Sequence, residues 1–195
     1  MTGNDGYSTP GHQNKLIPPL PRPDLALARR LIQDKRHDEA LPQLDALLAV
    51  EPDNPEALLL KAYLLLNRKD YSTAHAQALR LMTLDTWSVD AFLLLSMAAK
   101  WRLQADEAIG WLKKAVYACQ ECWPAHYYLA DLYRNGGDTE LARRAYRAVL
   151  GLLAGSAAGT GTKHLPLDLP VGEIRFLCEH QLARMPVARP RARLG

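Results

Sequence analysis

Small residues recur every 34 positions through most of this 195-residue chain. One series consists of Ala40, Ala74, Ala108 and Ala142. A second series lies 12 positions ahead of the first and consists of Ala28, Ala62, Ser96 and Ala130. Two backbones can approach closely only where the side chain between them is small. Two small residues in each period therefore predict a pair of helices that cross at these points, once per repeat.

Helix start and stop signals divide each period into two helices. Asp24, Asp38, Asp70 and Asp138 stand at predicted N-caps, and the pair 136–137, Gly-Gly, ends one helix. The predicted helices span residues 24–35, 38–50, 55–67, 71–84, 89–101, 105–119, 123–135 and 138–153. A 34-residue helix-turn-helix period resembles the tetratricopeptide repeat. That resemblance implies an all-α fold, an αα-solenoid of four hairpins over residues 24–153, stabilised by the stacking of neighbours.

The flanking segments differ in composition from the repeats. Residues 1–23 are polar and proline-rich and predict a disordered lead-in, residues 154–170 a flexible linker, and residues 186–195 a basic tail. Residues 171–185 predict one more helix, with an apolar stripe made of Ile174, Leu177, Cys178, Leu182 and Met185. We expect this helix to cap the fourth repeat. The alternative is that it occupies the binding groove until a partner displaces it.

Bulk composition restricts the class of protein. The hydrophobic content of 48% suits a buried core, and a net charge of +3 with mixed signs disfavours a nucleic-acid protein. No apolar run reaches the roughly 18 residues that a membrane span needs. The first residues lack a signal-peptide pattern, so we expect a cytoplasmic protein without membrane insertion. Three cysteines in such a chain indicate reduced thiols.

The first helix of each repeat is expected to line a concave groove. Positions four apart on these helices form one stripe, which begins with the leucines Leu25, Leu59 and Leu93. The predicted binding residues are Arg29, Tyr63, Asn67, Met97, Trp101, Tyr127, Asp131 and Arg134. An aromatic and polar lining suits a protein partner that presents an extended peptide or a helix, with the aromatic residues as anchors. The alternative is that several of these side chains pack on adjacent helices.

Chemistry-bearing residues form no recognisable active site. Cys119, Cys122 and His126 have a spacing compatible with metal binding, which is kept as an alternative function. A structural zinc site needs four ligands, however, and no second pair has matching spacing. No Ser/His/Asp set or carboxylate pair occurs at a meaningful spacing. We therefore expect a non-enzymatic protein with no metal and no cofactor.

The last third of the chain carries a narrower resemblance. The run CWPAHYYLADLYRNGGDTELARRAYRAVLGLL, a spacer and then LPLDLPVGEIRFLCEHQLARM resemble the repeat region attached to some bacterial chemoreceptor methyltransferases of the CheR type. The glycine-rich S-adenosylmethionine loop of that family does not occur in this sequence. The resemblance therefore implies a regulatory module, stand-alone or excised, whose partner is a chemoreceptor, a methyltransferase or a related signalling protein. A general adaptor unrelated to chemotaxis is the alternative.

Overall fold

The computed structural model describes residues 24–155, 162–167 and 169–186. Its helices are α1 (Leu25–Gln33), α2 (His37–Val50), α3 (Pro55–Asn67), α4 (Tyr71–Leu84), α5 (Val89–Trp101), α6 (Ala105–Ala118), α7 (Trp123–Asn135), α8 (Thr139–Ala154) and α9 (Val171–Arg184). The expected all-α solenoid is confirmed. The lead-in at 1–23 and the tail beyond residue 186 lie outside the described residues.

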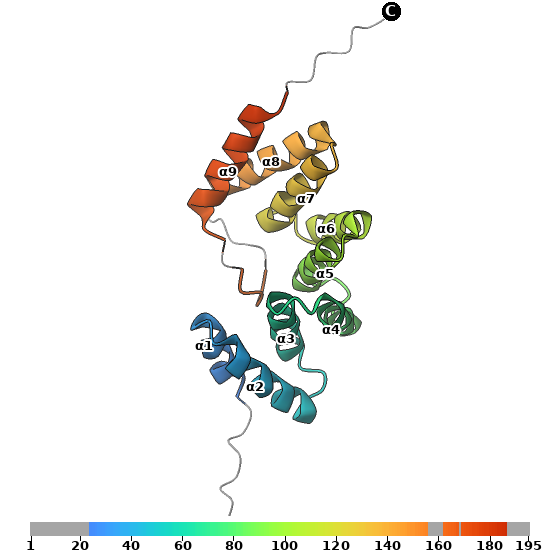
Figure 1. Ribbon diagram of the computed structural model, residues 1–195, viewed down its shortest axis with the longest axis vertical. Helices are drawn as coiled ribbons and strands as arrows, with labels where there is room; N and C mark the ends of the chain where they lie inside the picture. The colour runs from blue at the N-terminus through green and yellow to red at the C-terminus, as the bar shows by residue number, and fades with distance from the viewer. Residues whose placement is uncertain (1–23, 156–161, 168, 187–195) are drawn as a thin grey trace, which may run out of the picture.

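Four helical hairpins follow one another along a curve. The hairpins α1/α2, α3/α4, α5/α6 and α7/α8 stack in chain order, and α9 packs against α8 (Figure 1). The first helix of each hairpin faces the inner side of the curve, and the second lies on the outer side (Figure 1). We call helices α1, α3, α5 and α7 the inner helices. None of the helices in the described ranges combines the length and the apolar character that a membrane crossing demands.

The 34-residue series of small side chains lies inside the hairpins. Its seven alanines are at most 1% exposed, and Ser96 is 3% exposed. The Ser96 hydroxyl donates to the Leu93 carbonyl oxygen at 2.7 Å, so a polar side chain is satisfied at this buried crossing. The apolar residues that close each repeat are also buried. They are Leu31, Leu65, Ala99 and Tyr133 on the inner helices, and Leu44, Ala78, Leu112 and Tyr146 on the outer ones. The packing predicted from the repeat is confirmed.

The turn inside each hairpin repeats one backbone geometry. The residues with left-handed backbone are Lys35 (φ 60°), Lys69 (φ 63°), Leu103 (φ 62°) and Gly137 (φ 84°). The next residue then donates its N–H to the carbonyl of the closing residue, as Asp70 does to Leu65 at 2.9 Å. Only the fourth turn places a glycine at this position. The other three turns carry side chains in a conformation that glycine adopts more easily.

Three of the four predicted caps occupy the N-cap position, and two of these three accept a side-chain hydrogen bond from the helix. The Asp24 carboxylate accepts from the Ala26 N–H at 2.8 Å, and the Asp70 carboxylate accepts from the Thr73 N–H at 3.2 Å. The prediction for Asp38 is wrong, because α2 begins at His37 and Asp38 lies in its first turn. Asp138 occupies the N-cap position of α8 without a side-chain hydrogen bond. Asp38 instead places its charge beside the positive end of the helix dipole.

The C-terminal helix covers the last hairpin rather than the groove. Ile174 and Cys178 are buried, and the Arg175 guanidinium donates to the Leu153 carbonyl at 2.7 Å across the contact with α8. Leu177, predicted on the buried stripe, is 38% exposed. The five predicted residues span a wider arc than one neighbouring helix can cover, so the stripe is buried only in part.

Candidate peptide-binding groove

The predicted groove residues lie on three turns of the inner helices. Because the repeat is 34 residues long, equivalent positions form rows along the curve. One row consists of Arg29, Tyr63, Met97 and Asp131, and the next contains Asn67 and Trp101. Tyr127 and Arg134 lie on α7, one turn before and one turn after Asp131. The fold thus distributes the eight residues over four successive inner helices, as the sequence predicted.

The charged members of this set already have partners within the chain. Arg29 on α1 forms a two-armed ion pair with Glu56 on α3. Lys100 on α5 approaches Asp131 on α7 at 2.8 Å, and Arg134 approaches the other Asp131 oxygen at 2.8 Å. Burial opposes ionisation of Asp131, but the hydrogen bonds from Lys100 and Arg134 outweigh it and hold its pKa below the usual range. The Arg29–Glu56 and Lys100–Asp131 pairs connect one inner helix to the next, whereas Arg134 and Asp131 both lie on α7.

The predicted aromatic anchors differ in accessibility. Trp101 is 59% exposed and stacks on Tyr71, with ring centroids 6.0 Å apart. Tyr63 is half-buried and meets His37 edge-on at 6.4 Å. Tyr127 is half-buried beside Tyr128, and burial raises the Tyr127 pKa. Trp101 therefore offers the largest accessible aromatic surface of the three.

The leucines at the start of the stripe do not line an open groove. Leu59 is 3% exposed and Leu93 is 0% exposed, whereas Leu25 is half-buried. The expectation that Leu59 and Leu93 line an open groove is wrong, because both side chains are buried. Leu59 lies on the wall of a cavity that also includes Asp90, Lys163 and His164.

A returning segment of the chain lies on the inner side of the curve (Figure 1). We call residues 162–167 the internal strap. The N–H groups of Lys163 and His164 donate to the Asp90 carboxylate at 3.1 and 2.9 Å. The His164 ring nitrogen Nδ1 lies 3.7 Å from the Glu56 carboxylate. Leu165 is 5% exposed and belongs to the hydrophobic core. A segment predicted as part of a flexible linker thus contacts the groove through main chain and side chain.

A small hollow remains beside the strap on the same side. It has a volume of about 340 Å³ between α1, α3 and the strap. Its walls are formed by Arg29, Ile32, Gln33, Glu56, Leu60, Lys163, His164 and Pro166. The strap therefore shares its surroundings with Arg29, one of the predicted binding residues.

Asp90 and Glu56 contact the strap, and neither was predicted as a groove residue from the sequence. They occupy the second position of α5 and α3 and are one repeat period apart. Asp90 is only 3% exposed; burial raises its pKa, against the opposing effect of the hydrogen bonds from His164 and Lys163. The recurrence of an acidic residue at one repeat position was the available signal. The pairing with residues 163 and 164, more than 70 positions away, had no signal in the sequence.

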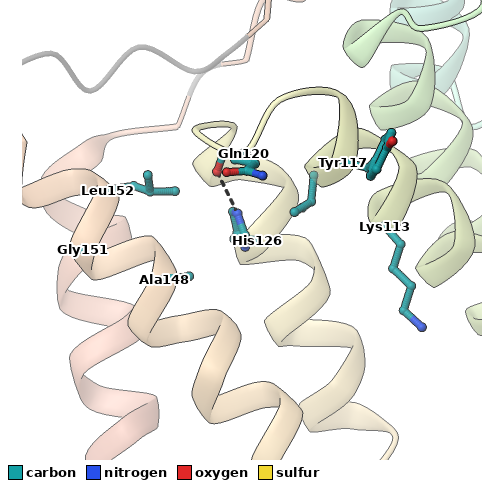
Figure 2. A pocket seen from close by; sticks show the side chains of 8 residues that line it. Lys113, Tyr117, Gln120, His126, Ala148, Gly151 and Leu152 are labelled. Atoms are coloured by element: carbon teal, nitrogen blue, oxygen red, sulfur yellow. Dashed lines mark hydrogen bonds between the residues drawn. The ribbon is translucent and has the colours of Figure 1, made fainter.

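A second hollow lies between α6, α7 and α8. It has a volume of about 640 Å³ and is lined by Lys113, Val116, Tyr117, Gln120, His126, Ala148, Gly151 and Leu152. Figure 2 shows His126 directed at Gln120, whose carbonyl oxygen lies 3.1 Å from Nε2. Tyr117 stands at its edge with 78% of its surface exposed. We call this hollow the outer cleft.

The Cys119, Cys122 and His126 set does not form a metal site. Among the residues that the structure describes, no three His, Cys, Asp or Glu side chains are grouped so that they could hold a metal ion. Cys122 is fully buried, and burial raises the pKa of its thiol to about 12, which disfavours the thiolate that a metal requires. His126 is engaged with Gln120 instead. The alternative of a metal-binding function is not supported.

The fold and the repeat register define a tetratricopeptide-repeat solenoid. The family described as Tetratricopeptide repeat matches residues 25–85. The structure is similar to the crystal structure of MamA protein, with a TM-score of 0.60 and 20% identity over 85% of this chain and 94% of that one. It is also similar to the type III secretion translocator chaperone SycD of Yersinia enterocolitica, with a TM-score of 0.58 and 18% identity over 68% and 83%.

A further similar structure contains a bound partner segment. It is PcrH in complex with the chaperone binding region of PopD, with a TM-score of 0.57 and 14% identity over 68% of this chain and 90% of that one. At these identities the similarities establish the fold alone. No curated protein matches the sequence.

Proposed function

We propose that this protein is a non-catalytic interaction scaffold that binds a segment of another protein on its inner face. One observation carries the proposal: a segment from a distant part of the chain, the internal strap, already lies there and is held by Asp90 through main-chain hydrogen bonds. Solved proteins of the same fold support it, because PcrH holds the chaperone binding region of PopD and SycD is a translocator chaperone. The proposed ligand is an extended peptide or a helix.

The inner face provides anchors of the kind that peptide recognition uses. Trp101 is 59% exposed, and Asn67 is exposed one repeat before it. Met97 and Tyr63 are half-buried on the adjoining row. Rigid aromatic side chains lose little conformational entropy on binding, so Trp101 is the principal proposed anchor.

Selection of peptides from a random display library on the immobilised full-length chain tests this function. Trp101→Ala should weaken the selected peptides at least about tenfold, as expected for an anchor residue. Tyr117→Ala is the matched control, because Tyr117 is a similarly exposed aromatic residue in the outer cleft. Peptides that depend on Tyr117 and tolerate Trp101→Ala would place binding in the outer cleft and contradict the proposal.

A finer assignment, to a bacterial chemosensory methylation system, depends on the resemblance of residues 122–153 and 165–185 described above. A short helix, α9, follows the Leu/Pro segment, as that resemblance implies. None of the similar structures named above is described as a methyltransferase, so a general adaptor remains the alternative. Titration of the full chain with a purified CheR-type methyltransferase and with a chemoreceptor cytoplasmic domain separates the two. Binding that Trp101→Ala abolishes supports the chemosensory assignment, and no binding to either protein argues for the general adaptor.

A further inference from the structure

Part of the contact between the internal strap and the inner face is made by the main chain of the strap and does not depend on its side chains. The Asp90 carboxylate accepts from two consecutive main-chain N–H groups, those of Lys163 and His164. Lys163 and His164 are both bent, which lets their consecutive N–H groups reach one carboxylate, and any peptide that bends in the same way without proline at these two positions presents the same pair of donors. Hydrogen bonds to a charged acceptor are among the stronger ones in proteins. Asp90 is therefore suited to hold the main chain of a ligand.

Side-chain contacts add a sequence preference to this main-chain contact. Leu165 buries all but 5% of its surface, and Pro166 lies beside it on the wall of the small hollow. His164 faces Glu56, whose carboxylate also pairs with Arg29. A basic or imidazole side chain is favoured next to this carboxylate, and an apolar one is favoured at the following position. The contacts thus select a basic residue followed by leucine and proline.

The strap is an addition to the repeat fold rather than a part of it. The hairpins form their own crossings through the small-residue series, and none of those residues lies within the strap. Asp90 is 3% exposed with the strap in place, and the donors to its carboxylate come from the strap. If the strap left, water could reach this carboxylate, so any occupant that again excludes water must supply donors of its own or leave the carboxylate unsatisfied at a large cost.

We propose that the internal strap is a resident copy of the partner's binding motif. The partner supplies a segment, bent as the strap is, in which a basic residue precedes Leu-Pro, and this segment replaces the strap on Asp90, on Glu56 and at the Leu165 position. The proposal deepens the proposed function, on which it rests, by naming the class of peptide that the inner face accepts. It also makes the strap a built-in competitor of the partner.

The loss of affinity that the strap imposes on a free peptide can be predicted. A tethered segment acts at an effective concentration on the order of millimolar when its tether permits binding. A free peptide whose affinity for the empty site is tens of micromolar is then weakened by roughly ten- to a hundredfold. Displacing the strap by mutation should restore that affinity without any change to the groove itself.

The test uses a fluorescent peptide with the sequence of residues 162–167, Thr-Lys-His-Leu-Pro-Leu, and the full chain. Leu165→Asp in the protein makes burial of the strap unfavourable and leaves Asp90 and Glu56 intact. His164→Pro is the second variant, because it removes one strap N–H and the imidazole beside Glu56 but no buried apolar group. Fluorescence anisotropy should show about tenfold or tighter binding to either variant than to the wild type. Circular dichroism and thermal melting check that each variant is folded.

Two controls test the recognition itself. Asp90→Ala added to Leu165→Asp should weaken the peptide at least about tenfold, and so should methylation of the peptide nitrogen that corresponds to His164. Equal affinity of wild type and both folded strap variants would overturn the proposal. Dimerisation of the wild type that disappears in Leu165→Asp would also overturn it, since the occupant would then be the strap of a second copy.

The experiments distinguish failure of this inference from failure of the proposed function. If the strap peptide does not bind the folded variants but library peptides still bind in a manner that requires Trp101, only the present inference fails. If neither class of peptide binds, the proposed function fails as well.

Discussion

The main-chain N–H of His164 donates a hydrogen bond to the Asp90 carboxylate at 2.9 Å, joining residues 74 positions apart. The contact closes a loop that passes from the third hairpin through the fourth and back to the inner face (Figure 1). Asp90 lies in the first turn of α5, where the helix dipole favours a negative charge. The same carboxylate therefore lies at the start of a helix and accepts hydrogen bonds from the strap.

Replacing Asp90 should release the strap locally. Asp90→Ala removes the acceptor for the N–H groups of Lys163 and His164, so the His164 amide should exchange with deuterium roughly five- to a hundredfold faster. Glu56→Ala is the control, because the contact of Glu56 with the strap is through the His164 side chain, at 3.7 Å. Hydrogen-exchange mass spectrometry of residues 162–167 provides the measurement. Exchange at His164 that is the same in Asp90→Ala and wild type would show that this hydrogen bond does not hold the strap.

The left-handed turn position predicts opposite effects for two glycine substitutions. A Cβ at Gly137 would meet no atom within 4 Å, but the φ of 84° disfavours any other residue. Gly137→Ala should therefore reduce the free energy of unfolding by about 1 kcal/mol. A Cβ at Gly110 also meets nothing, and Gly110 lies inside α6, so Gly110→Ala should raise stability by up to about 1 kcal/mol. Urea denaturation measures both, and changes of the same sign would contradict the backbone explanation.

The small-residue crossing predicts a large effect of added volume at one position of α4. Ala74 is 1% exposed at its crossing with α3, so Ala74→Leu should force the helices apart and cost about 1–3 kcal/mol. Ala76 lies on the same helix and is exposed, and Ala76→Leu should change stability by no more than about 0.5 kcal/mol. Thermal unfolding compares the pair. Equal midpoints for the two variants would remove the steric reason for the 34-residue alanine series.

The ion-pair cluster on α5 and α7 predicts acid sensitivity. Asp131 has a depressed pKa in the folded chain, so its contribution to stability is present above the unfolded pKa of about 3.9 and is lost as the pH falls through the folded value. Asp131→Asn should cost roughly 1–3 kcal/mol at neutral pH, and the difference from wild type should shrink as the medium becomes more acidic. Urea denaturation of both proteins at several pH values measures this difference in the free energy of unfolding. A difference that does not depend on pH would mean that the charge of Asp131 contributes nothing.

Local features of the chain were largely predictable from sequence. The bounds of α3, α4, α5 and α7 agree with the predicted ranges because proline, aspartate and glycine signals mark their ends. The crossings at Ala74 and Ala108 followed from the period alone. The errors arose where distant parts of the chain meet: Leu59 and Leu93 were expected in an open groove but are buried, and Leu59 lies beside residues 163 and 164 of the strap. A helical stripe shows which positions share a face but not what covers that face.

Interactions between residues that are near one another in the chain account for the repeat. The spacing of small residues fixes where each pair of helices can touch, and the caps and turns fix where each helix stops, since these are interactions between residues near one another in the chain. What occupies the inner face depends instead on contacts between distant parts of the folded chain. The curve of the stack brings Asp90 and Glu56 opposite residues 163–165, and no local preference in a segment rich in glycine, threonine and proline encodes that meeting. The burial of Asp90 and the ordering of the strap both result from that contact across the stack, which is a property of the assembled solenoid.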